Sequence, residues 1–275
     1  MLVPLRKLVH PTDLTREGQA AFALALKLAL GAHARLVLAH VDAAGVQPGW
    51  HEFPRVRATL AAWGALPADA ASEQVAELGL GVEKWRLEGD PLLSLAERIK
   101  AVEPDLLVMS THARRGIERL VRGSLAEPLA RVTRVPTLFV PVGASPCVDS
   151  GSGRTALRRV LFPVEAPLAP PPRGALGLAA ALAAALGVER PVGELLHVGQ
   201  GTPLAPKDLA GWSWEARAVE GEVVERIAEA ARGAQLVVMT TRGHDGLLDT
   251  ILGSTVERLL REVSCPVLAV PAPSE

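Results

Sequence analysis

Residues 105–141 read DLLVMSTHARRGIERLVRGSLAEPLARVTRVPTLFVP, and residues 235–271, which lie 130 positions later, read QLVVMTTRGHDGLLDTILGSTVERLLREVSCPVLAVP. Each stretch contains a short apolar run, a glycine-containing turn, a Gly-Ser pair, a helical segment and a strand led by proline. The two align without a gap, so that Gly123-Ser124 matches Gly253-Ser254. A repeat of this length indicates a tandem protein built from two related units.

The chain length agrees with this division, because 275 residues accommodate two domains of ordinary size. We expect a first domain at 1–143, a linker at 144–156 and a second domain at 157–275. The linker prediction rests on a small, polar segment that has no hydrophobic pattern. A hydrophobic content of 49% with 21% charged residues is typical of a globular chain with a buried core.

Composition argues against several classes of protein. The net charge of −1 differs from the strongly basic balance of dedicated nucleic-acid binders. The N-terminus has no long apolar signal segment, and the longest apolar run, 175–188, is shorter than a membrane span. The two cysteines, Cys147 and Cys265, have neither metal-ligand spacing nor the number needed for a disulfide framework. We therefore expect a cytoplasmic protein that binds neither nucleic acid nor membrane.

Apolar runs alternate with helical patterns throughout the first half. The sequence predicts strands at 7–12, 34–41, 82–88, 105–110 and 137–140, with helical segments at 16–30, 54–78, 91–102 and 124–133. This alternation predicts parallel βαβ units and a sheet that helices cover on both faces.

The second half repeats the pattern with one omission. Strands are predicted at 159–163 and 194–198, on either side of a helix at 173–186. About 40 residues separate His40 from the next strand, but only about 15 separate His197 from its counterpart. The fold class is therefore α/β: two tandem open five-stranded parallel sheets of Rossmann-like type, the second copy lacking one helix.

The turns after the first and fourth strands of each copy are the candidate ligand contacts. In an open parallel sheet, ligands bind beyond the carboxyl ends of the strands, where the strand order reverses. Glycine lets the backbone approach a phosphate closely, and a helix start directs amide groups at an anion. The first copy offers Pro11, Thr12, Asp13, Ser110, Ala113, Gly123 and Ser124, and the second offers Pro163, Glu165, Thr240, Gly243, Gly253 and Ser254.

These motifs resemble the universal stress protein family. In its nucleotide-binding members the fourth strand ends in Gly-x2-Gly-x9-Gly-Ser/Thr, and an Asp ends the first strand. The resemblance implies an adenine nucleotide alpha hydrolase-like fold, a stress-response role and an ATP site, with or without Mg, at the carboxyl edge of the sheet. It also implies that strands 137–140 and 267–270 pair to give an intramolecular pseudo-dimer, and it leaves a homodimer open. Val41, Val198 and Thr255 complete the candidate nucleotide contacts.

Neither copy matches the family pattern in full. The first has Ser110 and Ala113 where the first two glycines of the motif would stand, although Asp13 is present. The second keeps Gly243 but has Thr240 at the first position and Glu165 in place of the Asp. Its motif is the better one, whereas its scaffold is the shortened one, so the sequence leaves open which copy binds.

Three functional hypotheses follow. The first is adenine nucleotide binding in one half with little or no turnover, and the second is a non-binding interaction scaffold that works through its pseudo-dimer. The third is a weak ATPase. Ser124-x-x-Glu127 and Ser254-x-x-Glu257 also fit capping boxes, which would explain both serines without a ligand. The chain has no P-loop pattern and no catalytic triad at readable spacing, so we predict neither dedicated catalytic residues nor a metal site.

Overall fold

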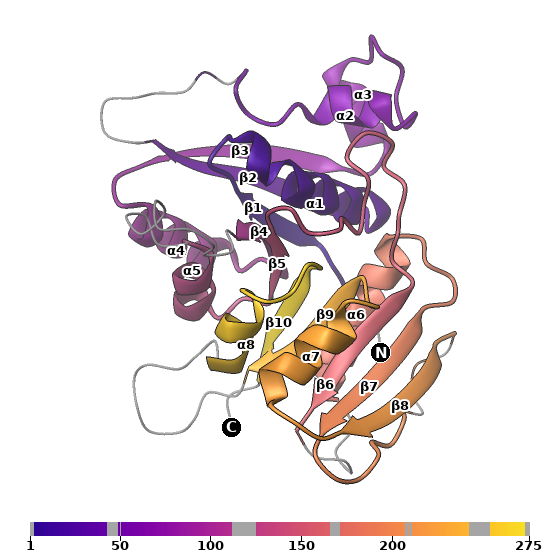
Figure 1. The fold of residues 1–275 in the computed structure, drawn as a ribbon. Helices are drawn as coiled ribbons and strands as arrows, with labels where there is room; N and C mark the ends of the chain where they lie inside the picture. The colour runs from indigo at the N-terminus through magenta and orange to yellow at the C-terminus, as the bar shows by residue number, and fades with distance from the viewer. Residues whose placement is uncertain are drawn as a thin grey trace.

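A computed structural model of the chain describes residues 3–42, 49, 51–111, 125–165, 171–206, 209, 211–241 and 254–272. Its strands form one ten-stranded sheet in the order β3-β2-β1-β4-β5-β10-β9-β6-β7-β8 (Figure 1). Within each half the neighbouring strands run parallel, as in the pairing of Leu8 with Leu106 and of Val160 with Leu236. The predicted α/β fold class, with two tandem five-stranded parallel units, is confirmed.

The elements follow the predicted alternation closely. The first half contains β1 (Lys7–Pro11), α1 (Gln19–Gly31), β2 (Arg35–Asp42), α2 (Val56–Ala62), α3 (Ser72–Glu77), β3 (Gly81–Glu88), α4 (Pro91–Val102), β4 (Leu106–Thr111), α5 (Ala126–Thr133) and β5 (Thr137–Pro141). The second contains β6 (Arg159–Val164), α6 (Arg173–Ala185), β7 (Val192–Val198), β8 (Ser213–Val219), α7 (Val223–Ala231), β9 (Leu236–Thr241), α8 (Ser254–Leu259) and β10 (Val267–Pro271).

Two predicted helices differ from the structure. The segment 16–30 begins as a 3-10 turn, Arg16–Gly18, and becomes α-helical only at Gln19. The Ala/Leu pattern at 54–78 is two short helices, α2 and α3, rather than one continuous segment. Gly64 adopts a left-handed conformation with φ of +72° directly after α2, and Pro67 follows, so the backbone turns before the helix can continue.

The second half lacks the counterpart of α2 and α3, as predicted. Within the described part of 199–212 no helix connects β7 to β8. Three aromatic rings cover this part of the sheet in place of a helix. The rings of Trp212 and Trp214 stack with centroids 5.5 Å apart, and Phe162 lies 5.5 Å from Trp214. Large aromatic side chains bury enough area to close a core that has lost a helix.

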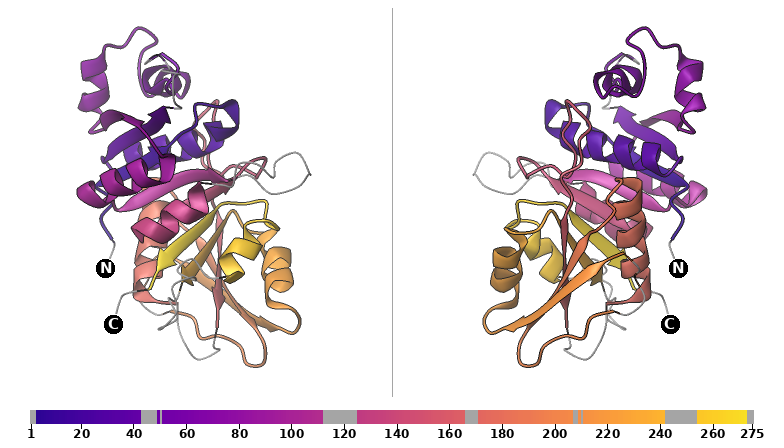
Figure 2. Two further views of the ribbon diagram at one scale, coloured as in Figure 1. Left: turned by 90° about the vertical axis from the view of Figure 1, so that its left-hand side faces the viewer. Right: turned by 90° about the vertical axis from the view of Figure 1, so that its right-hand side faces the viewer.

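The two halves join through their last strands, which confirms the predicted terminal pairing. Strand β5 runs antiparallel to β10, with Leu138 opposite Leu268 and Phe139 opposite Val267. All four side chains are buried. The pairing turns two five-stranded units into a single mixed sheet (Figures 1 and 2).

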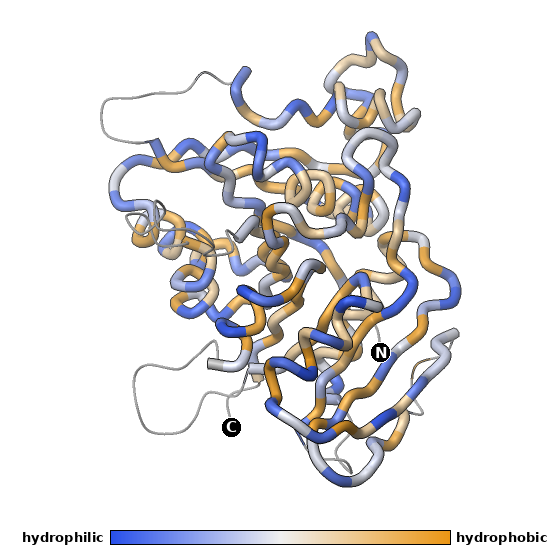
Figure 3. The backbone as a smooth tube through the Cα atoms, viewed as in Figure 1, coloured by the Kyte–Doolittle hydropathy of each residue, from blue (hydrophilic) through white to orange (hydrophobic). Residues whose placement is uncertain are grey.

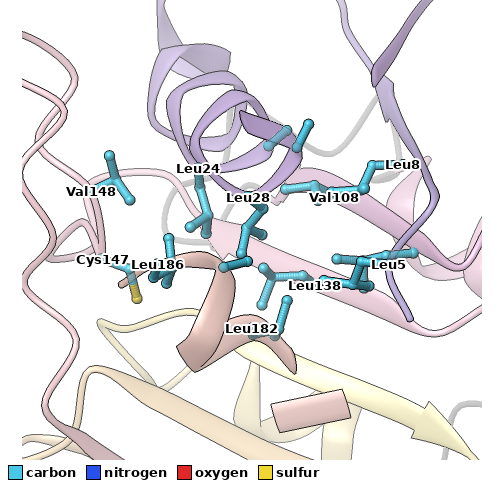
Figure 4. Packing of buried hydrophobic residues seen from close by; sticks show 14 of the residues in the cluster. Leu5, Leu8, Leu24, Leu28, Val108, Leu138, Cys147, Val148, Leu182 and Leu186 are labelled. Atoms are coloured by element: carbon cyan, nitrogen blue, oxygen red, sulfur yellow. The ribbon is translucent and has the colours of Figure 1, made fainter. Parts of the chain in front are cut away.

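Each face of the sheet carries one hydrophobic core that both halves share. One core packs beneath α1 and α6, and Leu24 and Leu28 meet Leu138 and Leu182 in it (Figure 4). The other core packs beneath α4, α5, α7 and α8. Apolar colour is accordingly frequent along the central strands of the sheet (Figure 3). No helix in the described residues is long and apolar enough to cross a membrane.

The segment 144–156 is packed, contrary to its patternless sequence. Cys147 and Val148 are buried, and the Cys147 thiol donates to the Gln235 carbonyl at 2.8 Å. The Trp63 indole donates to the Ser150 carbonyl at 3.0 Å. Because Trp63 belongs to the first half and Gln235 to the second, the segment ties both halves together.

An ion pair also crosses the junction. Arg131 of α5 pairs with Glu257 of α8, and both side chains are partly buried. Glu257, expected in a capping box, therefore serves the contact between the halves. Ser254 is the first residue of α8, and no side-chain hydrogen bond caps α5 at Leu125. Ser124 and Gly253 lie outside the described residues.

A close contact between α1 and α6 predicts that Gly31 does not tolerate a larger side chain. A Cβ built on Gly31, the last residue of α1, would overlap the backbone carbonyl of Ala185 in α6. We expect Gly31→Ala to lower the free energy of unfolding by about 1–3 kcal/mol, because overpacking at backbone contact forces the helices apart. The measurement is urea denaturation followed by circular dichroism.

Gly174→Ala is the matched control, because it also lies in a helix but its added Cβ would meet nothing within 4 Å. This control should be neutral or stabilise the protein by at most about 1 kcal/mol, since alanine is the better helix former. Equal stability of the two variants would show that α1 and α6 do not touch at this point.

Candidate functional site

The candidate site of the first half lies where the strand order reverses. Strand β1 sits between β2 and β4, so the turns that follow β1 and β4 flank the same point at the carboxyl edge. The turn after β1 is built by local hydrogen bonds. The Asp13 carboxylate accepts from the Thr15 amide at 3.0 Å and from the Thr15 hydroxyl at 2.8 Å. Leu14 between them has a φ of +63°, so the turn holds a left-handed residue at its tip.

Gly18 brings the two turns together. The position that a Cβ would occupy on Gly18 lies 3.7 Å from Asp13 Oδ1 and 3.8 Å from Ser110 Oγ. Asp13 is exposed and Ser110 half-buried, so solvent reaches both groups. The absence of a side chain at Gly18 therefore leaves space beside a carboxylate and a hydroxyl, immediately before α1.

A histidine on the second strand fixes the first turn in both halves. Nδ1 of His40 donates to the Thr12 carbonyl at 2.8 Å, and Nδ1 of His197 donates to the Val164 carbonyl at 3.1 Å. Both imidazoles therefore take part in backbone hydrogen bonds at the end of the first strand of their half. Among the described residues no group of three or more His, Cys, Asp or Glu could hold a metal ion.

A charged pair extends the site along β2 and β3. Asp42 Oδ2 accepts from Arg86 Nε at 2.7 Å, and Asp42 Oδ1 lies 3.8 Å from Nε2 of His40. Within the described structure, Asp42 Oδ1, Arg86 Nη2 and Thr111 Oγ1 are buried without a hydrogen-bond partner. Buried polar atoms of this kind are costly, and at the carboxyl edge of a sheet they fit contacts to a ligand or to ordered water.

The chain also matches the model of a known protein family. The model of the universal stress protein family matches residues 4–141 and 203–271, which together make up more than half of the chain. The chain belongs to the universal stress protein family.

Solved structures agree on the fold of this universal stress protein. A universal stress protein from Archaeoglobus fulgidus superposes with a TM-score of 0.60 and 18% identity, over 98% of this chain and 97% of that one. A functionally unknown protein from Pseudomonas aeruginosa gives a TM-score of 0.60 and 15% identity, over 97% and 92% of the two chains. At such identities the likeness concerns the fold alone.

A curated relative matches a shorter stretch. It is a universal stress protein of Methanocaldococcus jannaschii, 41% identical over 59 residues. These residues are 21% of this chain and 35% of that relative, so the matched stretch spans about a third of the relative.

The structure describes the predicted site residues of the first half in part. Pro11 is buried at the end of β1, Thr12 follows with its hydroxyl accepting from the Leu14 amide at 3.1 Å, and Val41 is half-buried in β2. Ser110 and Asp13 meet at Gly18. Ala113, Gly123 and Ser124 lie outside the described residues.

The second half is described less completely at its carboxyl edge. Pro163 and Thr240 are half-buried in β6 and β9, Val198 ends β7, and Glu165 is exposed beyond β6. Thr255 is half-buried as the second residue of α8. Gly243 and Gly253 lie outside the described residues.

Three residues of the candidate site were not predicted from the sequence: Gly18, Asp42 and Arg86. Gly18 carries no motif, because a single glycine before a helix has many uses. Asp42 and Arg86 are 44 positions apart, and only the parallel pairing of β2 with β3 brings them together. Asp42 could have been found from the alternation of β2, since it shares a sheet face with His40.

Burial couples the protonation of His10 to the stability of the fold. His10 is enclosed beneath α1 and donates from Nδ1 to the Val108 carbonyl at 2.8 Å. Burial lowers its pKa from 6.5 to about 4, because the charged ring would lose its hydration, while the hydrogen bond and Asp13 oppose this shift. Phe162 of β6 stands in the equivalent position of the second half and cannot be protonated.

We expect the free energy of unfolding to fall as the pH drops from 6.5 to 4, with His10 responsible for up to ~3 kcal/mol of the loss. In that range the unfolded chain binds the proton more tightly than the folded one, and above pH 6.5 the contribution is constant. Urea titrations of wild type and His10→Phe at several pH values measure this difference. Parallel pH profiles for the two proteins would contradict it.

Proposed function

We propose that this universal stress protein binds an adenine nucleotide, ATP, in its first half and acts in a stress response without dedicated catalysis. The observation that carries the proposal is the convergence of the Asp13 carboxylate and the Ser110 hydroxyl beside Gly18, at the switch point of the sheet. The family resemblance of the two duplicated turns supports the choice of ligand.

The groups of the site suit the parts of a nucleotide. A carboxylate accepts hydrogen bonds from an exocyclic amine or a ribose hydroxyl, and charge-assisted bonds of this kind contribute about 1.5–3 kcal/mol each. Asp13 is held in place by Thr15, so little side-chain entropy is lost when it binds. The half-buried Val41 offers an apolar surface nearby, at the carboxyl end of β2.

The first half is the better candidate for three reasons. It keeps the aspartate of the family pattern, whereas the second half has the longer Glu165. It also keeps helices between its second and third strands, α2 and α3, while the second half has replaced them with aromatic rings. Buried orphan atoms on Asp42, Arg86 and Thr111 belong to the first half as well.

Magnesium would enter with the phosphates rather than through a protein site. The described residues contain no metal-binding group of three or more carboxylate, imidazole or thiol side chains. Mg²⁺ commonly keeps several waters and binds substrate phosphates together with one or two carboxylates. Asp13 is an exposed carboxylate at this edge that could take such a part.

Asp13→Asn tests the proposal, and Glu165→Gln is its matched control in the other half. We expect Asp13→Asn to weaken ATP binding about tenfold, since one charge-assisted hydrogen bond is lost, and Glu165→Gln to leave the affinity unchanged. Isothermal titration calorimetry with ATP and Mg²⁺ measures both. Release of adenine nucleotide from the denatured protein gives an independent readout.

Two bulky substitutions test which half contains the ATP site. Gly18→Leu would fill the space beside Asp13 and Ser110 and should abolish binding, whereas Gly243→Trp should not. The opposite result places the site in the second half. If neither wild type nor any variant binds ATP, the protein is an interaction scaffold, and phosphate release that Gly18→Leu abolishes would make it a weak ATPase.

A further inference from the structure

The α2–α3 region of the first half borders a cavity that is open to solvent at the edge of the sheet. The cavity has a volume of about 830 Å³ and lies between α2, α3 and the edge strand β3. In Figure 1, α2 and α3 stand at the outer end of the first half, beyond the strands. Phe53, Val75 and Leu80 are buried residues that line it. The volume falls within the range of small-molecule pockets, about 300–1,000 Å³.

The charges that line the cavity are mainly positive. Among the described residues, Arg55, Arg57 and Lys84 line it together with a single acidic residue, Asp69. The whole chain has a net charge of −1, so the basic excess is local. The pKa of Lys84 is lowered from its usual value by burial and by the nearby positive charge of Arg57. An anion placed between these two groups would relieve that repulsion.

The basic groups adjoin an apolar wall. The Lys84 ammonium lies 5.2 Å from the centre of the Phe53 ring, whose residue is only 1% exposed. Arg57 is anchored across the cavity, where it donates to the Ala70 carbonyl at 3.2 Å. The cavity therefore combines fixed positive charge with a hydrophobic surface, which is the arrangement that an anionic amphiphile requires.

The second half shows that the fold does not need this cavity. It closes the corresponding part of its sheet with Trp212 and Trp214 and has no helix there within the described residues. The cavity also lies apart from the candidate nucleotide site, because none of Asp13, Gly18 and Ser110 lines it. The cavity is built by elements of the first half, α2, α3 and β3.

We propose that this cavity binds a small anionic amphiphile, a single carboxylate or phosphate head group on an apolar chain. Lys84 and Arg57 contact the head group, and Phe53, Val75 and Leu80 contact the chain. The proposal is independent of nucleotide binding at Asp13.

Decanoate is the probe, with decyl phosphate as the second head group and 1-decanol and decylammonium as neutral and cationic controls. Binding is measured on the full chain by calorimetry, below micelle-forming concentrations. We expect saturable one-to-one binding of the anions only, and the tighter of the two identifies the head group. Equal binding of decanol would reduce the site to a hydrophobic surface and overturn the proposal, as would no binding of either anion.

Lys84→Gln should weaken decanoate binding roughly tenfold, because one charge-assisted contact is lost. Lys27→Gln is the matched control, since the Lys27 ammonium lies 5.8 Å over the Trp63 ring but outside the cavity. Equal losses in the two variants would contradict the assignment. Titration with ATP in the presence of saturating decanoate should give an unchanged affinity, and direct competition would show that both ligands share one site.

A second pair of variants tests the volume rather than the charge. Ala58 is exposed on α2 and lines the cavity, whereas Ala62 is exposed on the same helix and does not line it. Ala58→Trp should abolish decanoate binding and Ala62→Trp should leave it unchanged, with both variants as stable as wild type in thermal unfolding. Decanoate binding that survives Ala58→Trp would place the ligand elsewhere.

Discussion

The antiparallel pairing of β5 with β10 determines the arrangement of everything else in the molecule. The two copies are related by a shift of 130 positions, which carries Leu138 onto Leu268. These two leucines face each other in the ladder, and the flanking pairs Phe139–Val267 and Thr137–Ala269 exchange under the same shift. The pairing is therefore isologous, as in a twofold dimer, although one chain supplies both sides. The edges of β5 and β10, which could otherwise pair with strands of other chains, are paired with each other.

This pairing has a geometric consequence for the two candidate sites. Strands within each half are parallel, but β5 and β10 run in opposite directions. The carboxyl ends of the strands in one half therefore point toward the opposite edge of the sheet from those in the other half. Asp13 and Glu165 consequently belong to separate edges. One copy could lose a helix and change its acidic residue without disturbing the turns of the other, while the shared cores kept both copies folded.

Much of the architecture could be predicted from the sequence because the repeat and the alternation of apolar runs act over short distances. The terminal pairing followed from the family resemblance of the duplicated strands. The split of 54–78 could not be predicted, since the left-handed turn at Gly64 is a backbone choice that an Ala/Leu pattern conceals. The packing of 144–156 was missed for a related reason: its polar residues satisfy one another, with Asp149 Oδ1 accepting from Ser152, while Cys147 and Val148 turn inward. At the site, the residues of the turns were predicted, whereas Gly18, Asp42 and Arg86 depend on tertiary placement.

A comparison of the two halves shows which contacts at the carboxyl edge are shared and which residues differ. Both halves keep a histidine on the second strand that donates to the carbonyl at the first turn, His40 in one and His197 in the other. A contact retained in both copies serves the shape of the turn, because a loop carbonyl without a donor would be costly in either. The differences lie elsewhere: His10 against Phe162, Asp13 against Glu165, and the α2–α3 cavity against stacked tryptophans. Since the shared framework tolerates both versions of each feature, folding of the sheet does not require either version.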